Sequence, residues 1–122
     1  MRVVCLKDAA SGRRLLERVE VAERPLARLM GLMGRAGLEP GAGMFFPRCT
    51  SIHMFFMRFA IDAVYVDRDL KVRRVMSALR PWRLSWCPGA WGVLEAPAGW
   101  AAGAGLRPGM QIAFEETPET TA

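Results

Sequence analysis

One carboxylate and several arginines are the side chains of this sequence best suited to chemistry. Asp62 interrupts the apolar segment 60–66, so its charge must be paired, or its pKa raised, if it faces the interior. Arg58, four residues earlier, and Arg35, in a glycine-rich stretch, are natural partners for it. Such a set could line a pocket that holds a polar ligand or performs acid–base chemistry. It could also form a structural ion pair, or Asp62 could accept hydrogen bonds from backbone amides, and we favour these structural roles.

Glu95 raises the same question, because it lies in a second apolar segment, 93–96. If its carboxyl group met that of Asp62 across the core, one of the two would hold a proton near neutral pH. The more ordinary outcome is that Glu95 pairs with an arginine at the surface or caps the turn at Ala98 and Gly99. The sequence leaves both outcomes open.

A thiol and an imidazole stand four residues apart at Cys49 and His53, and Cys87 follows far downstream. Three such groups could bind zinc, and a thiol with an imidazole could act as nucleophile and base. Against both, His53 is the only histidine, and the spacing lacks the close cysteine pair typical of zinc sites. We therefore expect no metal and no cofactor, and free thiols at all three cysteines, Cys5 included.

Tryptophans and arginines are interleaved in one stretch of the chain. The tryptophans are Trp82, Trp86, Trp91 and Trp100, and Arg80 and Arg83 lie beside the first two. Aromatic and basic side chains together can stack on nucleic-acid bases, but the chain has only two lysines and no known nucleic-acid-binding motif. We expect Trp91 and Trp100 to pack against the core. The first two would mark a partner surface if they were exposed.

The size and composition favour one soluble domain. The chain has 122 residues, of which 52% are hydrophobic and 24% charged, with a net charge of +5 that comes almost entirely from arginine. This predicts a single domain over residues 1–115 and a polar, disordered tail over 116–122. Charged residues follow the start closely, and no apolar run is long enough to span a bilayer. These features predict a cytoplasmic protein with no membrane association.

Short apolar segments separated by glycine and proline predict a mainly β fold. The expected strands are 3–6, 15–21, 60–66, 72–76, 91–96 and 111–114. The sequence Asp67-Arg68-Asp69 predicts a turn that joins the third and fourth of these into a hairpin. Helical spacing is limited to 25–33 and to 100–104, which ends at Gly105. We expect a small β-sandwich or barrel-like domain with one or two short helices.

Four motifs in order resemble one known family. They are Arg28-Leu29-Met30-Gly31-Leu32-Met33-Gly34-Arg35, Gly43-Met44-Phe45-Phe46, Phe56-Met57-Arg58-Phe59-Ala60-Ile61-Asp62 with Val64-Tyr65-Val66-Asp67, and Val93-Leu94-Glu95-Ala96-Pro97-Ala98-Gly99 with Gly105-Leu106-Arg107-Pro108-Gly109. Over residues 28–112 the chain resembles the DUF192 family, small bacterial and archaeal proteins of unknown function. The resemblance implies a compact β-rich fold and no settled activity.

These observations lead to a working hypothesis of a small binding or interaction module. Its pocket would hold a small polar or anionic ligand. The expected pocket residues are Arg28, Arg35, Phe56, Arg58, Asp62, Trp91 and Glu95. Two alternatives remain: a small enzyme that uses Asp62 or Glu95 as acid or base, and an accessory subunit that docks on a protein through residues 80–91.

Overall fold

The structure is a computed structural model that describes residues 2–23, 37–54 and 57–118. Within these residues the chain forms nine strands and one short helix. In chain order they are β1 (Arg2–Asp8), β2 (Arg14–Val21), β3 (Ala42–Pro47), β4 (Ser51–His53), β5 (Ile61–Val66), β6 (Val72–Leu79), β7 (Leu84–Trp86), β8 (Gly92–Pro97), α2 (Trp100–Ala104) and β9 (Ile112–Glu116).

Seven of these strands form one curved sheet in the order β6-β5-β8-β3-β2-β1-β9. Its two end strands meet through an antiparallel bridge between Lys71 and Gln111. The Val72 N–H donates to the Met110 carbonyl at 2.8 Å, and the Ile112 N–H donates to the Leu70 carbonyl at 3.1 Å. The sheet therefore closes on itself at one corner, which leaves the end strands with shortened open edges.

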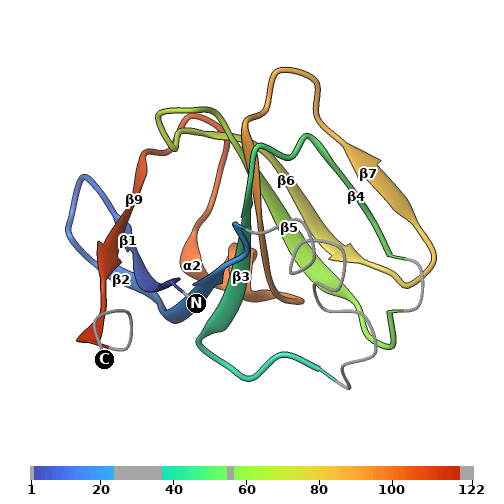
Figure 1. Cartoon of the computed structure of the whole chain (residues 1–122), viewed down its shortest axis with the longest axis horizontal. Helices are drawn as coiled ribbons and strands as arrows, with labels where there is room; N and C mark the ends of the chain where they lie inside the picture. The colour runs from blue at the N-terminus through green and yellow to red at the C-terminus, as the bar shows by residue number, and fades with distance from the viewer. Residues whose placement is uncertain (1, 24–36, 55–56, 119–122) are drawn as a thin grey trace.

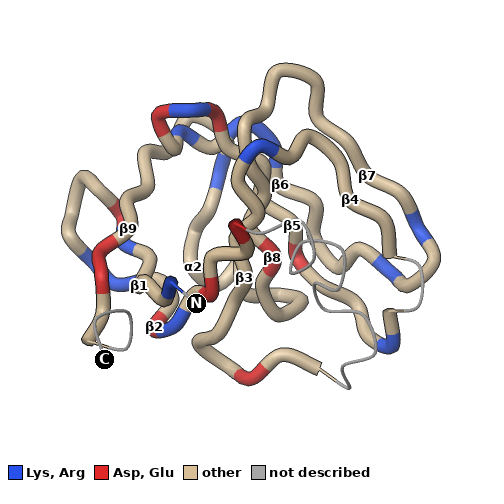
Figure 2. Tube along the Cα trace, viewed as in Figure 1, with Lys and Arg blue, Asp and Glu red and all other residues tan. Residues whose placement is uncertain are grey.

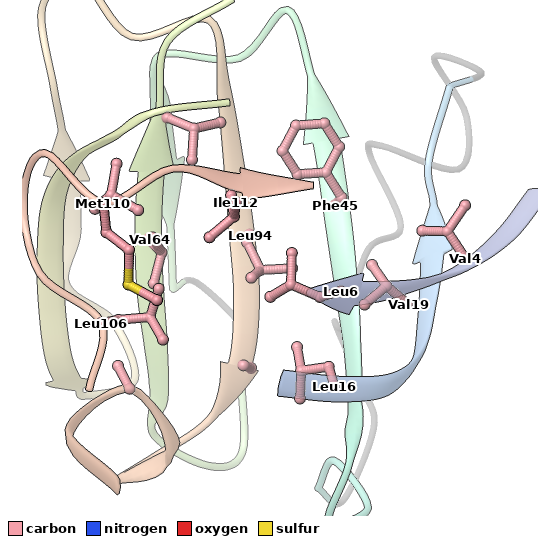
Figure 3. Close-up of a cluster of buried hydrophobic side chains, with 14 of the residues drawn as sticks. Val4, Leu6, Leu16, Val19, Phe45, Val64, Leu94, Leu106, Met110 and Ile112 are labelled. Atoms are coloured by element: carbon pink, nitrogen blue, oxygen red, sulfur yellow. The ribbon is translucent and has the colours of Figure 1, made fainter. Parts of the chain in front are cut away.

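Inside this barrel lies the first of two cores. Figure 3 shows many of the apolar side chains that fill it, contributed by β1, β2, β3, β5, β6, β8, β9 and the loop before β9. α2 covers one end of this core with Ala101, which is fully buried. Trp100 also packs here, and its indole N–H donates to the Leu15 carbonyl at 2.9 Å.

The second core lies on the outer face of the same sheet. It includes Met44 and Phe46 of β3 and Ile61, Ala63 and Tyr65 of β5. The small two-stranded sheet of β4 and β7 stands beside this face, at the side of the molecule away from β1, β2 and β9 (Figure 1). β5 is buried along its whole length because it has a core on each face, which explains why all of its residues except Asp62 are hydrophobic.

The expectation of a mainly β, barrel-like small domain is confirmed. The predicted hairpin is β5–β6, and the predicted helix at 100–104 is α2, which ends at Gly105 with φ 76°. The small sheet was not predicted, because strands of three residues leave little periodicity. The helix expected at 25–33 lies outside the described residues.

Two further features bear on the sequence predictions. β9 reaches Glu116, and Thr117 donates both its N–H and its hydroxyl to the Val3 carbonyl, so these two residues of the predicted tail are paired with β1 or lie in β9. In the described part of the chain, no helix has the length and apolar character needed to span a bilayer.

Candidate functional site

Asp62 is fully buried, and its carboxylate binds three backbone amides. Oδ1 accepts the N–H of Ala78 at 2.8 Å and that of Gly99 at 3.1 Å, and Oδ2 accepts the N–H of Ala101 at 2.8 Å. Gly99 is the N-cap residue of α2 and Ala101 lies in its first turn, where backbone N–H groups have no partner within the helix. Asp62 therefore caps α2 from a different element.

The third partner of Asp62, the N–H of Ala78, lies in a β-bulge of β6. β5 and β6 change register between Ile61 and Ala63, and Ala78 has a left-handed φ of 50°, which is unfavourable for a residue other than glycine. By accepting the Ala78 N–H, Asp62 stabilises this turn of the backbone. The geometry assigns Asp62 the backbone-binding role, one of the two structural roles expected for it.

Glu95 is 6% exposed and lies on the outer face of the sheet, beside Met44 on β3 and Ala63 on β5. Burial raises the pKa of its carboxyl group from 4.5 to about 8. Within the described residues its carboxyl group has no hydrogen bond or ion pair. Glu95 is thus a largely protonated carboxylic acid at neutral pH.

Two buried hydroxyl groups lie on the same side of the sheet as Glu95. Among the described residues, Tyr65 Oη and Ser85 Oγ have no hydrogen-bond partner. Burial raises the pKa of Tyr65, and the charges of Cys49, Cys87 and Glu95 raise this pKa further; Ser85 lies near enough to oppose the rise, but the two hydroxyls do not meet in hydrogen-bond geometry. Buried hydroxyls without partners are costly, and they often mark sites where a ligand or water binds.

A groove of about 300 Å³ opens at the other end of the barrel from α2. Asp62, near the start of β5, contacts α2, whereas Val66, at its end, accepts the N–H of Trp91 at 2.8 Å. The groove is lined by Arg2, Val21, Glu23, Phe45, Pro47, Arg68, Leu70, Trp91 and Phe114. Phe45 stacks at a tilt on Trp91, with ring centroids 6.1 Å apart, and meets Phe114 edge-on at 4.9 Å.

The charged side chains of the groove differ in their partners. Arg2 forms ion pairs with Glu116 at 2.6 Å and Glu23 at 3.6 Å. Arg68, in the turn between β5 and β6, is exposed and forms no ion pair within the described part of the chain. Arg68 is therefore the cation of this groove that is available to an anion.

Those of the expected pocket residues that the structure describes lie in different parts of the fold. Trp91 lines the groove, Asp62 contacts α2, and Glu95 lies on the outer face of the sheet. Arg58 is exposed and forms no ion pair with a described residue. Three of the expected residues lie outside the described ranges: Arg28, Arg35 and Phe56.

The thiol and imidazole groups are also dispersed. Cys49 precedes β4 and donates its Sγ–H to the Ser51 carbonyl at 2.9 Å, whereas His53 ends β4 and pairs with Leu84. Cys87 is buried, and all three cysteines are unpaired thiols. Over residues 2–23, 37–54 and 57–118, no three metal-ligating side chains come together.

Comparison with models of known protein families identifies one family. The model of the DUF192 family, described as an uncharacterized ACR, matches residues 6–114. The chain belongs to the DUF192 family.

A UPF0127 protein of Thermococcus sibiricus (strain DSM 12597 / MM 739) is 35% identical to this DUF192 chain over 88 residues. The match covers 67% of this chain and 56% of that relative, so the chain spans a little over half of the relative's length.

Two solved structures share the fold. One is a protein of unknown function from Novosphingobium aromaticivorans DSM 12444, with a TM-score of 0.77 and 25% identity, covering 91% of this chain and 83% of that one. The other, from Sinorhizobium meliloti 1021, is described as a proposed transcription regulator; its TM-score is 0.79 at 27% identity, covering 93% of this chain and 92% of that one.

Sequence reasoning missed most of the groove in this DUF192 domain. Arg68 was interpreted only as part of a turn, Phe45 only as part of a family motif, and Phe114 only as a strand residue. They approach Trp91 because β8 lies between β3 and β5, an order that no local pattern specifies. The unpartnered hydroxyls of Tyr65 and Ser85 left no signal in the sequence either, because their environment depends on the small sheet.

Proposed function

We propose that this DUF192 domain is a binding module that holds a small, planar anion in the groove at the open end of its barrel. The observation that carries the proposal is the combination of an aromatic floor with the guanidinium of Arg68, which forms no ion pair with a described residue. The mouth of a β-barrel is a common place for small-molecule sites. The volume of about 300 Å³ suits a ligand of one or two rings.

The aromatic floor supports an apolar ligand body. Phe45, Trp91 and Phe114 line the groove together and are fixed by their mutual ring contacts, so little ordering is needed when a ligand arrives. A planar ring placed against these faces gains contact area and aromatic stacking. The indole N–H of Trp91 has no hydrogen bond within the described residues and can donate to a ligand oxygen.

The charges support an anionic ligand. Arg2 is already bound to two carboxylates, whereas the guanidinium of Arg68 donates to no described residue. A guanidinium binds a carboxylate through two parallel hydrogen bonds, which fixes the orientation of the ligand. Glu23 on the rim disfavours a second negative group on the same ligand.

This proposal keeps the ligand class expected from the sequence and one of its residues, Trp91. It places Asp62 and Glu95 outside the ligand site, because Asp62 binds backbone amides at the α2 end and Glu95 lies on the other face. For Arg58, which is exposed elsewhere, ligand binding stays a prediction, as it does for Arg28, Arg35 and Phe56.

The test uses two probes with the same ring system and opposite charge, indole-3-acetate and tryptamine, titrated into ¹⁵N-labelled protein. We expect indole-3-acetate to shift the Trp91 indole N–H signal and tryptamine to leave it unchanged. Arg68→Glu should weaken indole-3-acetate binding at least about tenfold. Arg107→Glu makes the same charge change on the exposed loop before β9, away from the groove, and should bind like the unmodified protein. Equal binding of the two probes, or no shift at Trp91, would contradict the proposal.

A second candidate function is acid–base catalysis by Glu95. It is favoured by one observation: a carboxyl group with a pKa of about 8 that lies on the same side of the sheet as two unpartnered hydroxyls. General acids are tuned toward the working pH in this way. A ¹³C NMR titration of the Glu95 carboxyl group checks the candidate, and a pKa near 4.5 would remove it.

A further inference from the structure

The small sheet of β4 and β7 carries an exposed apolar face. Among the described residues, the large hydrophobic side chains that stand in solvent are Trp82, Leu84 and Trp86, which are 59%, 57% and 59% exposed. Leu84 and Trp86 alternate with buried Ser85, so both project from one face of β7. All three lie within five residues of the chain, and such clustering is unusual on a domain that has no partner for it.

This face is built by the backbone and is not a frayed loop. The Trp82 N–H donates to the Met54 carbonyl at 2.7 Å, and the Met54 N–H donates to the Arg83 carbonyl at 2.8 Å. Arg74 of β6 donates to the Trp86 carbonyl at 2.8 Å and ties β7 to the main sheet. Trp82 adopts a left-handed φ of 67°, a strained conformation for a tryptophan.

The charge around this face has a single sign. Residues 70–94 contain five Lys and Arg residues and no Asp or Glu, and residues 40–61 contain no Asp or Glu either. Arg80 and Arg83 flank Trp82, and both are exposed without an ion pair in the described chain. Figure 2 shows basic positions in the loop beside β7, whereas many of the acidic positions lie around β1, β2 and β9. The ion pairs that join two described residues lie on those three strands and the segment after β2.

We propose that Trp82, Leu84 and Trp86, with Arg80 and Arg83 at their rim, form a docking surface for an acidic segment of another protein. Tryptophan and arginine are the residues most enriched at the energetic centres of protein interfaces. The apolar centre fits apolar side chains of the partner, and the arginines fit carboxylates around them. A second copy of this chain is disfavoured as the occupant, because its own docking surface carries the same positive charge.

A protein fits the surface better than nucleic acid does. Nucleic-acid affinity comes mainly from basic side chains spread along the phosphate backbone, and here Leu84 lies between the two tryptophans. The docking surface also lies apart from the groove at Trp91 and Arg68, since the residues that line the groove include none of the five. The inference therefore stands independently of the proposed ligand.

The test is to select binding peptides from a displayed library of random sequences on the immobilised wild-type protein. We expect the selected peptides to combine Asp or Glu with large apolar residues. A synthetic peptide from the selection should lose at least about tenfold in affinity for the double variant Trp82→Ser/Trp86→Ser, and its binding should weaken as salt is added. The variant Arg80→Glu/Arg83→Glu should lose affinity likewise, whereas Arg13→Glu/Arg107→Glu carries the same charge change elsewhere and should bind normally.

Circular dichroism spectra of all three variants should match that of the wild type, because every substituted side chain is exposed. Selected peptides without acidic residues, or equal affinity for wild type and the tryptophan variant, would overturn the inference. So would tighter binding, through the same five residues, to random double-stranded DNA or to phosphatidylglycerol vesicles, which would assign the surface to that class of partner.

Discussion

Asp62 and Glu95 lie on opposite faces of the same sheet, although β5 and β8 are direct neighbours. Asp62 pairs with Ala96, and Glu95 pairs with Ala63, so the two carboxylates are one register position apart. Side chains alternate between faces along a strand, so this offset sends one carboxylate into the barrel and the other out of it. The two groups therefore cannot share a proton. Hydrogen bonds from backbone amides stabilise the buried Asp62 carboxylate, whereas the buried Glu95 carboxyl group is largely protonated.

Removing the Asp62 carboxylate should destabilise the folded protein, because it takes away the hydrogen bonds that hold the α2 end of the barrel together. Asp62→Ala leaves three N–H groups without their acceptor, that of Ala101 in a buried position and those of Ala78 and Gly99 in part-buried ones, and we expect a loss of about 4 kcal/mol in the free energy of unfolding. Asp62→Asn keeps one oxygen and should lose about 2 kcal/mol. Urea denaturation followed by tryptophan fluorescence measures both.

The matched control for this prediction is Asp69→Asn, in the exposed turn between β5 and β6, whose side chain makes no hydrogen bond within the described residues. It should change stability by less than about 0.5 kcal/mol. If Asp62→Ala were as stable as this control, the amide-binding role would be wrong.

Glu95 should make the protein less stable as the pH rises. Its pKa is about 8 in the folded state and near 4.5 when exposed, so the folded state holds the extra proton between these values. Stability is then greatest below pH 4.5 as far as this group is concerned, falls as the pH rises, and levels off above pH 8. Glu95→Gln should be more stable than the wild type by an amount on the order of 3 kcal/mol at pH 7.

Unfolding free energies of both proteins across this pH range test the prediction, and the difference between them should vanish toward pH 4.5. A constant difference at all pH values would mean that the carboxyl group titrates alike in the folded and unfolded states.

The sequence specified strands well where one pattern dominated, and it could not specify which strands become neighbours. The run of β5 and the turn at Arg68 were sufficient to predict a hairpin, because both signals are local. The same run raised the question of whether Asp62 faces the interior and left it open. It could not identify the partners of Asp62 either, since the Gly99 and Ala101 amides lie more than thirty residues away. The groove depends on β8 inserting between β3 and β5, which is a property of the assembled sheet.

The two unpartnered hydroxyls should contribute nothing to stability by themselves. Tyr65→Phe and Ser85→Ala each remove a buried polar group that has no hydrogen-bond partner among the described residues, so we expect each variant to equal the wild type or gain about 1 kcal/mol. Thermal denaturation measures this. A loss above about 1 kcal/mol in either variant would show that its hydroxyl is hydrogen-bonded in solution, for example by a bound water or ligand.

Replacing Gly43 and Gly103 with alanine should change the free energy of unfolding in opposite directions. A Cβ atom at Gly43, in β3, would lie 2.9 Å from the Glu95 carbonyl oxygen and 3.1 Å from Leu16 Cδ1. The first neighbour is a backbone atom, which cannot shift without disturbing the sheet, so Gly43→Ala should cost about 1 to 3 kcal/mol of stability by separating β3 from β8.

A Cβ atom at Gly103, in α2, would meet nothing within 4 Å, and alanine favours the helical conformation more than glycine does. Gly103→Ala should therefore add about 0.5 to 1 kcal/mol, and the same urea titration that reports a loss at Gly43 should report this gain. Equal effects at the two positions would contradict the close packing of β3 against β8.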